Sequence, residues 1–120
     1  MNIRVDKVQS ALLHEISDIV RRELDDPRLG IVTITGVRVT ADLQHATVFV
    51  SVFGDEDAIV HSVQALKRAS GFIHNQLGRR IHLKRVPVLE FRADDTIKRS
   101  SRIMELLHQV ENDLKPEKSE

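Results

Sequence analysis

The chain has 120 residues, which is enough for one domain with a modest core but too few for two independent domains. It contains no cysteine, so disulfides, thiolate nucleophiles and thiolate metal sites are excluded. Its 18 basic and 18 acidic residues cancel, and no apolar run approaches the roughly 20 residues that span a bilayer. The N-terminus lacks the pattern of a signal peptide, so we expect a soluble cytoplasmic protein.

An amphipathic pattern opens the chain. Apolar side chains recur there at three- and four-residue steps and predict a helix over roughly residues 4–25. Asp25, Asp26 and Pro27 are expected to end it, because proline disfavours helical geometry in the residue before it. Gly30 adds a second break, so a new element must follow.

Two strands are predicted next. Residues 31–40 are β-branched nearly throughout and predict the first strand. Val32 and Ile34 occupy even positions before Gly36, whereas Val37 and Val39 occupy odd positions after it. We therefore expect a β-bulge at Gly36 that returns the apolar residues to the core. A polar turn around Asp42 leads to a second strand over residues 46–53, and the connection is short enough for an antiparallel hairpin.

A broken helix follows the hairpin. The acidic residues 55–57 favour a helix start, and helical spacing continues until an interruption near Gly71. Gly78 and the basic pair after it are expected to end the second helical piece. A third strand begins after Pro87, and Asp95 or Thr96 can cap a final helix.

These elements predict a single α+β domain in which helices cover one face of a sheet. The order of the elements matches a type II KH domain, a small RNA-binding architecture. We therefore predict a KH-like domain with a C-terminal helix over residues 1–114. Residues 115–120 have no apolar side chain to bury and are predicted to form a disordered tail.

Positive charge gathers between Lys67 and Arg92, where seven basic residues face the single acid Glu90. A local cationic field on a neutral chain suggests contact with a polyanion, although a solvated surface explains the charge alone equally well. We predict phosphate contacts at Lys67, Arg68, Arg79, Arg80, Lys84 and Arg85, with Arg4 and Lys7 as weaker candidates.

Other chemistries have weaker support. The six histidines form no metal-binding spacing, and the glycines form no phosphate loop. The carboxylate pairs at 25–26 and 94–95 are better explained as helix caps or stops than as an acid and a base. Phe49 and Phe53 share one face of the second strand, where they could stack bases but are more often core residues. No metal, cofactor or catalytic residue is therefore predicted.

The chain closely resembles the ribosome-binding factor A family, which acts in bacterial small-subunit maturation. The resemblance spans about Arg4 to Leu107, and its main landmarks are Asp26-Pro27-Arg28-Leu29, Val32-Thr33-Ile34-Thr35-Gly36-Val37, Asp42-Leu43, Ala69-Ser70-Gly71-Phe72-Ile73 and Leu83-Lys84-Arg85-Val86-Pro87. His74, Val88 and Ser100 depart from the family pattern, and His74 can lose a positive charge near the proposed RNA face.

The resemblance implies a type II KH-like domain in which a kink at Ala69, Ser70 and Gly71 replaces the usual glycine-rich RNA loop. It also implies binding to the 30S ribosomal subunit and its 16S rRNA, a role in late processing of the 5′ end of that RNA, and a role in growth at low temperature. We expect a monomer that acts without catalysis, without a small-molecule substrate and without a membrane.

Two other functions remain open. The basic face could dock an acidic protein, with a strand edge or the face of Phe49 and Phe53 meeting another partner. A hydrolase that uses Asp94 is a third possibility. Steep salt dependence would favour RNA over an apolar protein contact, and turnover lost in Asp94→Ala would favour the hydrolase.

Overall fold

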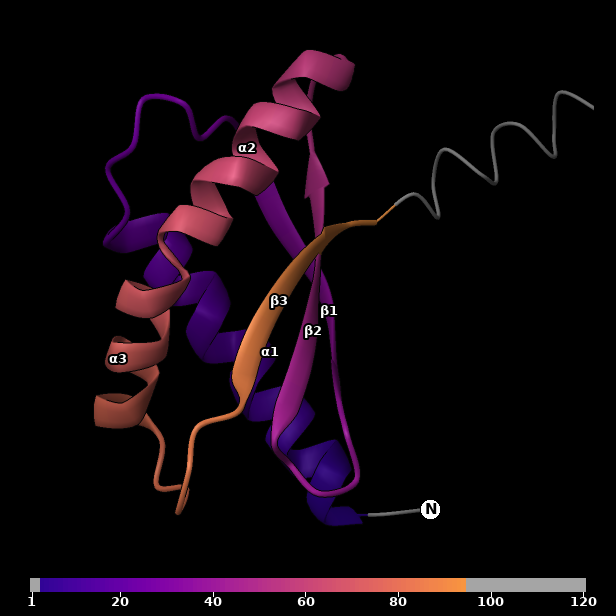
Figure 1. Cartoon of the computed structure of the whole chain (residues 1–120), viewed down its shortest axis with the longest axis vertical. Coiled ribbons are helices and arrows are strands. Elements are labelled where there is room, and N and C mark those ends of the chain that lie inside the picture. The colour runs from indigo at the N-terminus through magenta and orange to yellow at the C-terminus, as the bar shows by residue number, and fades with distance from the viewer. Residues whose placement is uncertain (1–2, 95–120) are drawn as a thin grey trace, which may run out of the picture.

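The computed structural model describes residues 3–94. The elements follow one another as α1 (Ile3–Arg22), β1 (Val32–Val39), β2 (His45–Val52), α2 (Glu56–Arg68), α3 (Ser70–Arg80) and β3 (Val88–Ala93) (Figure 1). The predicted α+β class and the predicted order of elements are confirmed as far as β3. The predicted final helix and the boundary between residues 114 and 115 lie outside the described residues.

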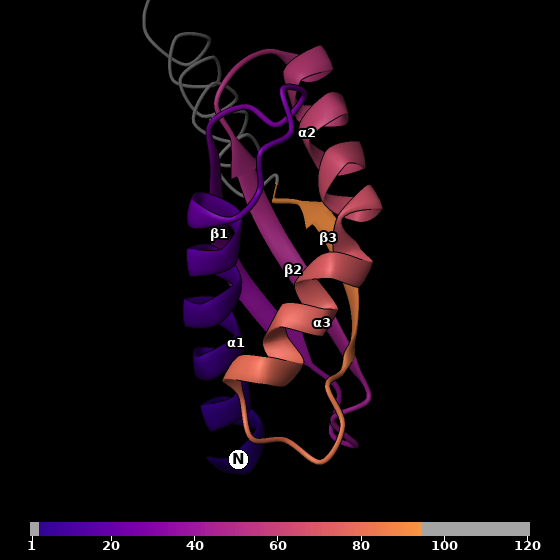
Figure 2. The ribbon, with the colours of Figure 1, turned by 90° about the vertical axis from the view of Figure 1, so that its left-hand side faces the viewer.

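The three strands form one sheet in the order β1-β2-β3. β1 and β2 pair antiparallel, as the hairpin prediction required, whereas β2 and β3 pair parallel. All three helices lie on one face of this sheet, so the described part of the molecule has two layers (Figures 1 and 2). The parallel pairing requires the long crossover that α2 and α3 supply.

The bulge predicted in β1 is present. The pairing register between β1 and β2 shifts between Ile34 and Gly36. This shift lets Ile34 and Val39 both point into the core although their positions differ in parity, and both are buried. Arg38 consequently stays out of the core and is exposed.

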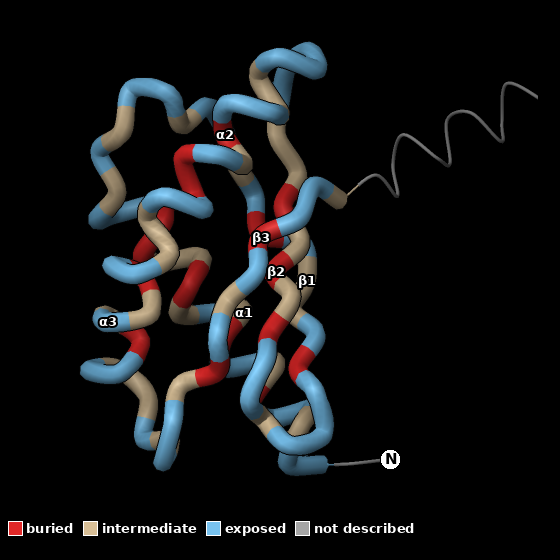
Figure 3. The backbone as a smooth tube through the Cα atoms, in the orientation of Figure 1, coloured by how far each residue is buried: buried red, intermediate tan, exposed pale blue. Residues whose placement is uncertain are grey.

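The core lies between the helices and the inner face of the sheet (Figure 3). Leu12, Ile16 and Ile19 of α1 have no exposed surface, as the three- and four-residue spacing predicts. They pack in one cluster with Val48 and Val50 of β2 and with buried residues of every other element. Burial of this apolar area is the main driving force for the fold.

The helix break lies at Ala69, which has φ −86° and ψ −1°. Its N–H donates to the Ala65 carbonyl at 3.0 Å, and its own carbonyl accepts from the Ile73 N–H at 2.9 Å, so hydrogen bonding continues on both sides. α2 packs on β2 and β3, whereas α3 packs on α1 and β3. The break therefore turns the chain from the sheet toward α1, and Gly71 lies in the first turn of α3 rather than at the bend itself.

Element ends differ from prediction by up to three residues. α1 ends at Arg22 because the chain then turns at Asp26, whose carboxylate accepts from the backbone N–H of Arg28 at 2.9 Å. α3 ends at Arg80, in the basic pair that was expected to end it together with Gly78. Asp55 caps α2 as expected, accepting from the Ala58 N–H at 2.9 Å.

Gly71→Ala is expected to stabilise the protein by about 0.5 to 1 kcal/mol, because alanine is the better helix former. A Cβ at this position would meet no atom within 4 Å. Gly54→Ala is the opposite control, since Gly54 has φ +132° and its added Cβ would lie 2.8 Å from the Cβ of Ala58. Urea denaturation of both variants checks this pair. If Gly71→Ala lowered the free energy of unfolding instead, the first turn of α3 would not behave as an ordinary solvent-exposed helical turn.

Candidate nucleic-acid interface

The predicted phosphate contacts fall into two groups, those that form an ion pair within the protein and those that do not. Within residues 3–94, the exposed side chains that form no ion pair include Lys67, Arg68, Arg79, Lys84 and Arg85. Other arginines are neutralised by neighbours, for example Arg92 by Glu90 at 2.7 Å. Positive charge on the helix side is therefore more available to a polyanion than the neutral composition indicates.

α3 presents an exposed stripe at four-residue spacing. Gly71, Asn75 and Arg79 recur at this interval and all are exposed, while Ile73 and Leu77 face the core. Because the glycine adds no side chain, another molecule can approach the backbone of the first helical turn closely. A cation closes the stripe at the C-terminal end of the helix.

Arg80 has a different environment from its neighbour Arg79. Its guanidinium contacts three carboxylates of α1 and the turn after it, namely Asp18 at 2.7 Å, Glu15 at 3.2 Å and Glu23 at 3.3 Å. Only 25% of its side chain is exposed. This ion-pair cluster joins α3 to α1.

The cluster also shifts ionisation. The hydrogen bond from Arg80 is the main cause that holds the pKa of Asp18 below its usual value of 3.8, and Arg22 and Arg21 add to it. Hydrogen bonds to Asp18 and Glu15 raise the pKa of Arg80. Both Asp18 and Arg80 are therefore charged at neutral pH.

Lys67 and Arg68 lie in the last turn of α2, next to the break. Arg68 lies close enough to Asp26 to contribute to its lowered pKa, although the hydrogen bonds from Arg28 are the main cause. Cations in the last turn of a helix also stabilise the helix itself. The charges of Lys67, Arg68 and Arg79 thus have a structural explanation besides a polyanion.

A second cationic group lies at the end of the molecule where α1 begins, at the lower end in Figures 1 and 2. Arg4, Lys84 and Arg85 line a hollow of about 430 Å³ there, together with residues of the turn between β1 and β2. Lys7 is exposed on α1. Neither Lys84 nor Arg85 belongs to a helix, so helix stabilisation does not explain them.

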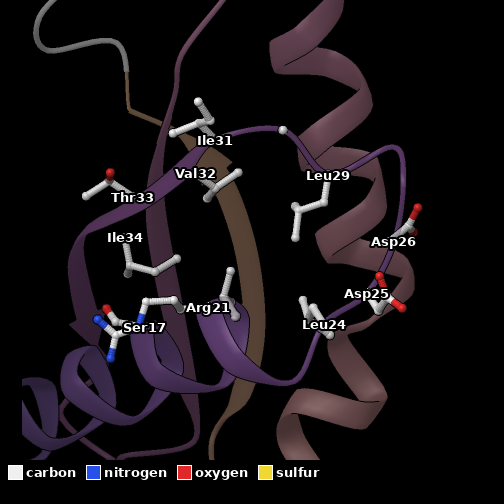
Figure 4. Close-up of a pocket in the computed structure, with 12 residues that line it drawn as sticks. Ser17, Arg21, Leu24, Asp25, Asp26, Leu29, Ile31, Val32, Thr33 and Ile34 are labelled. Carbon is white, nitrogen blue, oxygen red and sulfur yellow. The ribbon is translucent and has the colours of Figure 1, made fainter.

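A hollow of about 580 Å³ lies between the end of α1 and the start of β1 (Figure 4). Leu24, Leu29 and Ile31 give it apolar walls, and Asp25 and Asp26 add negative charge at one side. None of the predicted phosphate contacts lines it. Its acidic rim is unsuited to a polyanion.

The remaining sequence candidates do not assemble an active site. Phe53 is 79% exposed and Phe49 half-buried, so the interpretation of both as core residues is wrong. Asp94 accepts a hydrogen bond of 2.6 Å from the Thr35 hydroxyl. Within residues 3–94, no group of three or more histidine or carboxylate side chains is arranged so that it could hold a metal ion. Likewise, no helix in this range is long and apolar enough to cross a membrane.

The sequence profile of the family described as ribosome-binding factor A matches residues 4–107. The chain belongs to this family. A crystal structure of ribosome-binding factor A from Thermus thermophilus is 29% identical, with a TM-score of 0.67 over 74% of this chain and 93% of that one. A Thermotoga maritima candidate factor, solved by NMR, is 27% identical with a TM-score of 0.68, over 74% of this chain and 85% of that one.

A third related structure adds a ribosomal context. It is a homology model of the Thermus thermophilus factor, fitted into the cryo-EM map of its complex with the 30S subunit. That chain is 30% identical to this one and has a TM-score of 0.61, over 72% of this chain and 90% of that one. The fold described above is therefore the fold of ribosome-binding factor A.

Two features of this ribosome-binding factor A chain escaped the sequence analysis. Phe72, next to Gly71, is 43% exposed and is an aromatic side chain near the break. Phe72 lies off the apolar stripe of α3, and this spacing in the sequence could have predicted its exposure. The hollow at Leu43, Lys84 and Arg85 joins three distant segments, so no local pattern reveals it.

Arg80→Met is expected to lower the midpoint of thermal unfolding at pH 7, because three carboxylates lose their shared cation. Asp18 has its pKa lowered on folding, so its stabilising contribution is present above pH 3.8 and is lost as the pH falls through the folded-state pKa. The difference in midpoint between wild type and variant should therefore shrink in acid. Melts across this pH range test it, with Arg92→Met as the exposed control. A difference independent of pH would contradict the ion-pair explanation.

Proposed function

We propose that this protein binds the 30S ribosomal subunit through its 16S rRNA and assists late maturation of that RNA, including processing of its 5′ end. It acts in the cytoplasm as a monomeric binding factor and not as a catalyst. Membership of the ribosome-binding factor A family supports this proposal. So does the related Thermus thermophilus factor that is fitted into a map of its 30S complex.

One observation supports an RNA contact at the helix break. Next to the helix break, the exposed cations Lys67 and Arg68 end α2, and the exposed Gly71 lies in the first turn of α3. The two cations supply the attraction for a phosphate backbone, and the break places them beside the first turn of α3. A phosphate backbone can approach this turn because Gly71 has no side chain and faces open space.

The proposed contact follows α3 from the break to the end of the molecule (Figure 2). We name this surface the helical track and define it by the exposed residues Lys67, Arg68, Gly71, Asn75, Arg79, Lys84 and Arg85. Arg4 and Lys7 remain weaker predicted contacts. Arg80 supports the track by holding α3 on α1, which is a structural role and not a phosphate contact.

Lys67→Glu/Arg68→Glu is expected to weaken binding to purified 30S subunits and to flatten its salt dependence. Each lost phosphate contact should reduce the slope of log K against log salt by about 0.7 to 0.9. Arg38→Glu/Arg92→Glu is the matched control, because it makes the same charge change at two exposed positions on the sheet. Co-sedimentation over about 50 to 200 mM salt measures both.

Three outcomes of that series would count against the proposal. If the wild type never sediments with subunits at low salt, the proposed function fails. If the control weakens binding more than the track variant, the contact lies on the sheet face. If wild-type affinity hardly changes with salt, an apolar protein contact is favoured, and the exposed Phe53 is its first candidate.

Gly71→Val tests how closely the RNA approaches. The added side chain points into open space, so the fold should stay intact. It would, however, hold a phosphate backbone away from the first turn of α3, and we expect reduced affinity for 30S subunits. Co-sedimentation together with a circular dichroism spectrum separates docking from folding. Unchanged affinity would exclude close contact at Gly71.

A further inference from the structure

The hollow of about 430 Å³ at the end of the molecule is built from three segments that are distant in sequence. Arg4 comes from the first turn of α1, Leu43 from the turn between β1 and β2, and Lys84 from the segment between α3 and β3. These segments meet at the same end of the molecule in both ribbon views (Figures 1 and 2). The volume lies in the range of small-ligand pockets, about 300 to 1,000 Å³.

Apolar and cationic side chains line the hollow together. Leu43 and Leu83 line it and also pack against the core, whereas Arg4, Lys84 and Arg85 add positive charge. Asp42 adds one carboxylate, which is engaged by hydrogen bonds within its own turn. The combination suits a ligand with a flat apolar part and an anionic part.

Helix stabilisation does not account for Lys84 and Arg85, which lie outside any helix. In this respect they differ from Lys67, Arg68 and Arg79, the other cations of the helical track, and their placement points more directly to an anionic partner.

The turn that supplies Leu43 is closed by its own hydrogen bonds. The Asp42 carboxylate accepts from the Thr40 hydroxyl at 2.6 Å and from the Gln44 N–H at 3.1 Å, and the Leu43 N–H donates to the Thr40 carbonyl at 2.8 Å. The Thr40 hydrogen bond is the main cause of a lowered pKa of Asp42, so its charge is retained and already engaged in the turn.

Leu43 itself has a strained backbone. Its φ of 61° lies in the left-handed region, which glycine or asparagine adopts more easily than leucine. Strain of this kind persists only where the surrounding structure enforces it, and it often marks a binding site. Here the strain holds an apolar side chain in the lining of the hollow.

The opposite wall is also held in place. The Val88 N–H donates to the Gln44 carbonyl at 2.9 Å, which ties the turn to the start of β3. The His74 ring nitrogen Nε2 lies 3.1 Å from the Val86 carbonyl oxygen and fixes the segment after α3. The hollow is thus formed before any ligand arrives.

We propose that this hollow receives one unpaired nucleotide of a single-stranded RNA. The base lies on Leu43 and Leu83, the phosphate lies among Arg4, Lys84 and Arg85, and the amide of the exposed Gln44 is placed to bond a base edge. A base in a duplex cannot enter, because it is stacked and paired. This inference rests on the proposed function, since RNA is taken as the partner, and it adds that the partner is unpaired at this point.

The test uses a fluorescein-labelled single-stranded RNA of about ten nucleotides and a duplex of the same sequence. Wild type should bind the single strand more tightly than the duplex. Leu43→Gly removes one of the two apolar lining side chains and relieves the positive φ, and it should weaken single-strand binding about fivefold, the low end for one base contact, while duplex binding stays unchanged. Equal single-strand affinity for this variant would overturn the proposal.

Lys84→Ala/Arg85→Ala provides a second test at exposed positions that should not affect folding. It should weaken single-strand binding. The loss of affinity between about 50 and 200 mM salt should also be about tenfold smaller for this variant than for wild type. Arg38→Ala/Arg92→Ala is the matched control and should bind as wild type does. If the control matches the test variant, or if a polyglutamate peptide displaces the RNA as well as unlabelled single strand does, the hollow is not a nucleotide site.

Subunit binding distinguishes this inference from the proposed function. If wild type sediments with 30S subunits but the hollow variants bind the single strand normally, only this inference fails. Failure of wild type to sediment is a failure of the proposed function.

Discussion

The fold depends on one geometrical constraint, which is that two consecutive helices must cover a narrow sheet and also reach α1. The break at Ala69 meets this requirement by turning α3 away from β2 and toward α1 while Leu66, Ile73 and Leu77 all stay buried. The same bend exposes the first turn of α3. Packing and the proposed RNA contact therefore have a common cause, because the turn that closes the core also leaves Gly71 and Phe72 exposed.

In this neutral chain, ion pairing determines which positive charges are available to a partner, and the number of basic residues does not. Arg80 is held by carboxylates of α1 and acts within the fold, whereas its neighbour Arg79 projects from the exposed stripe of α3. Two adjacent arginines thus have separate roles, one in holding the helix and one on its outer surface. The second cationic group, around Lys84, lies where no helix end requires it and combines charge with apolar lining residues.

Local patterns predicted much of this structure. The change of parity at Gly36 was sufficient to predict the bulge, and the interruption of helical spacing near Gly71 predicted a break within two residues of Ala69. The partners of Arg80 could not be predicted, because its contact with Asp18 joins residues 62 positions apart. The hollow at Leu43 also depends on tertiary folding, and its φ of 61° follows from the closed turn rather than from any preference of leucine.

The central claim is that RNA meets the helix side of the molecule and not the face of the sheet that lies opposite α1, α2 and α3. Because the chain has no cysteine, a hydroxyl-radical probe can be attached at single introduced cysteines without background. Exposed Asn75 and Ala41 lie on α3 and in the turn beside the hollow, while exposed Thr33 and Glu90 lie on the sheet face. Directed cleavage of 16S rRNA in 30S complexes should be strong from Asn75→Cys and Ala41→Cys and weak from Thr33→Cys and Glu90→Cys. Stronger cleavage from the sheet positions would contradict this account.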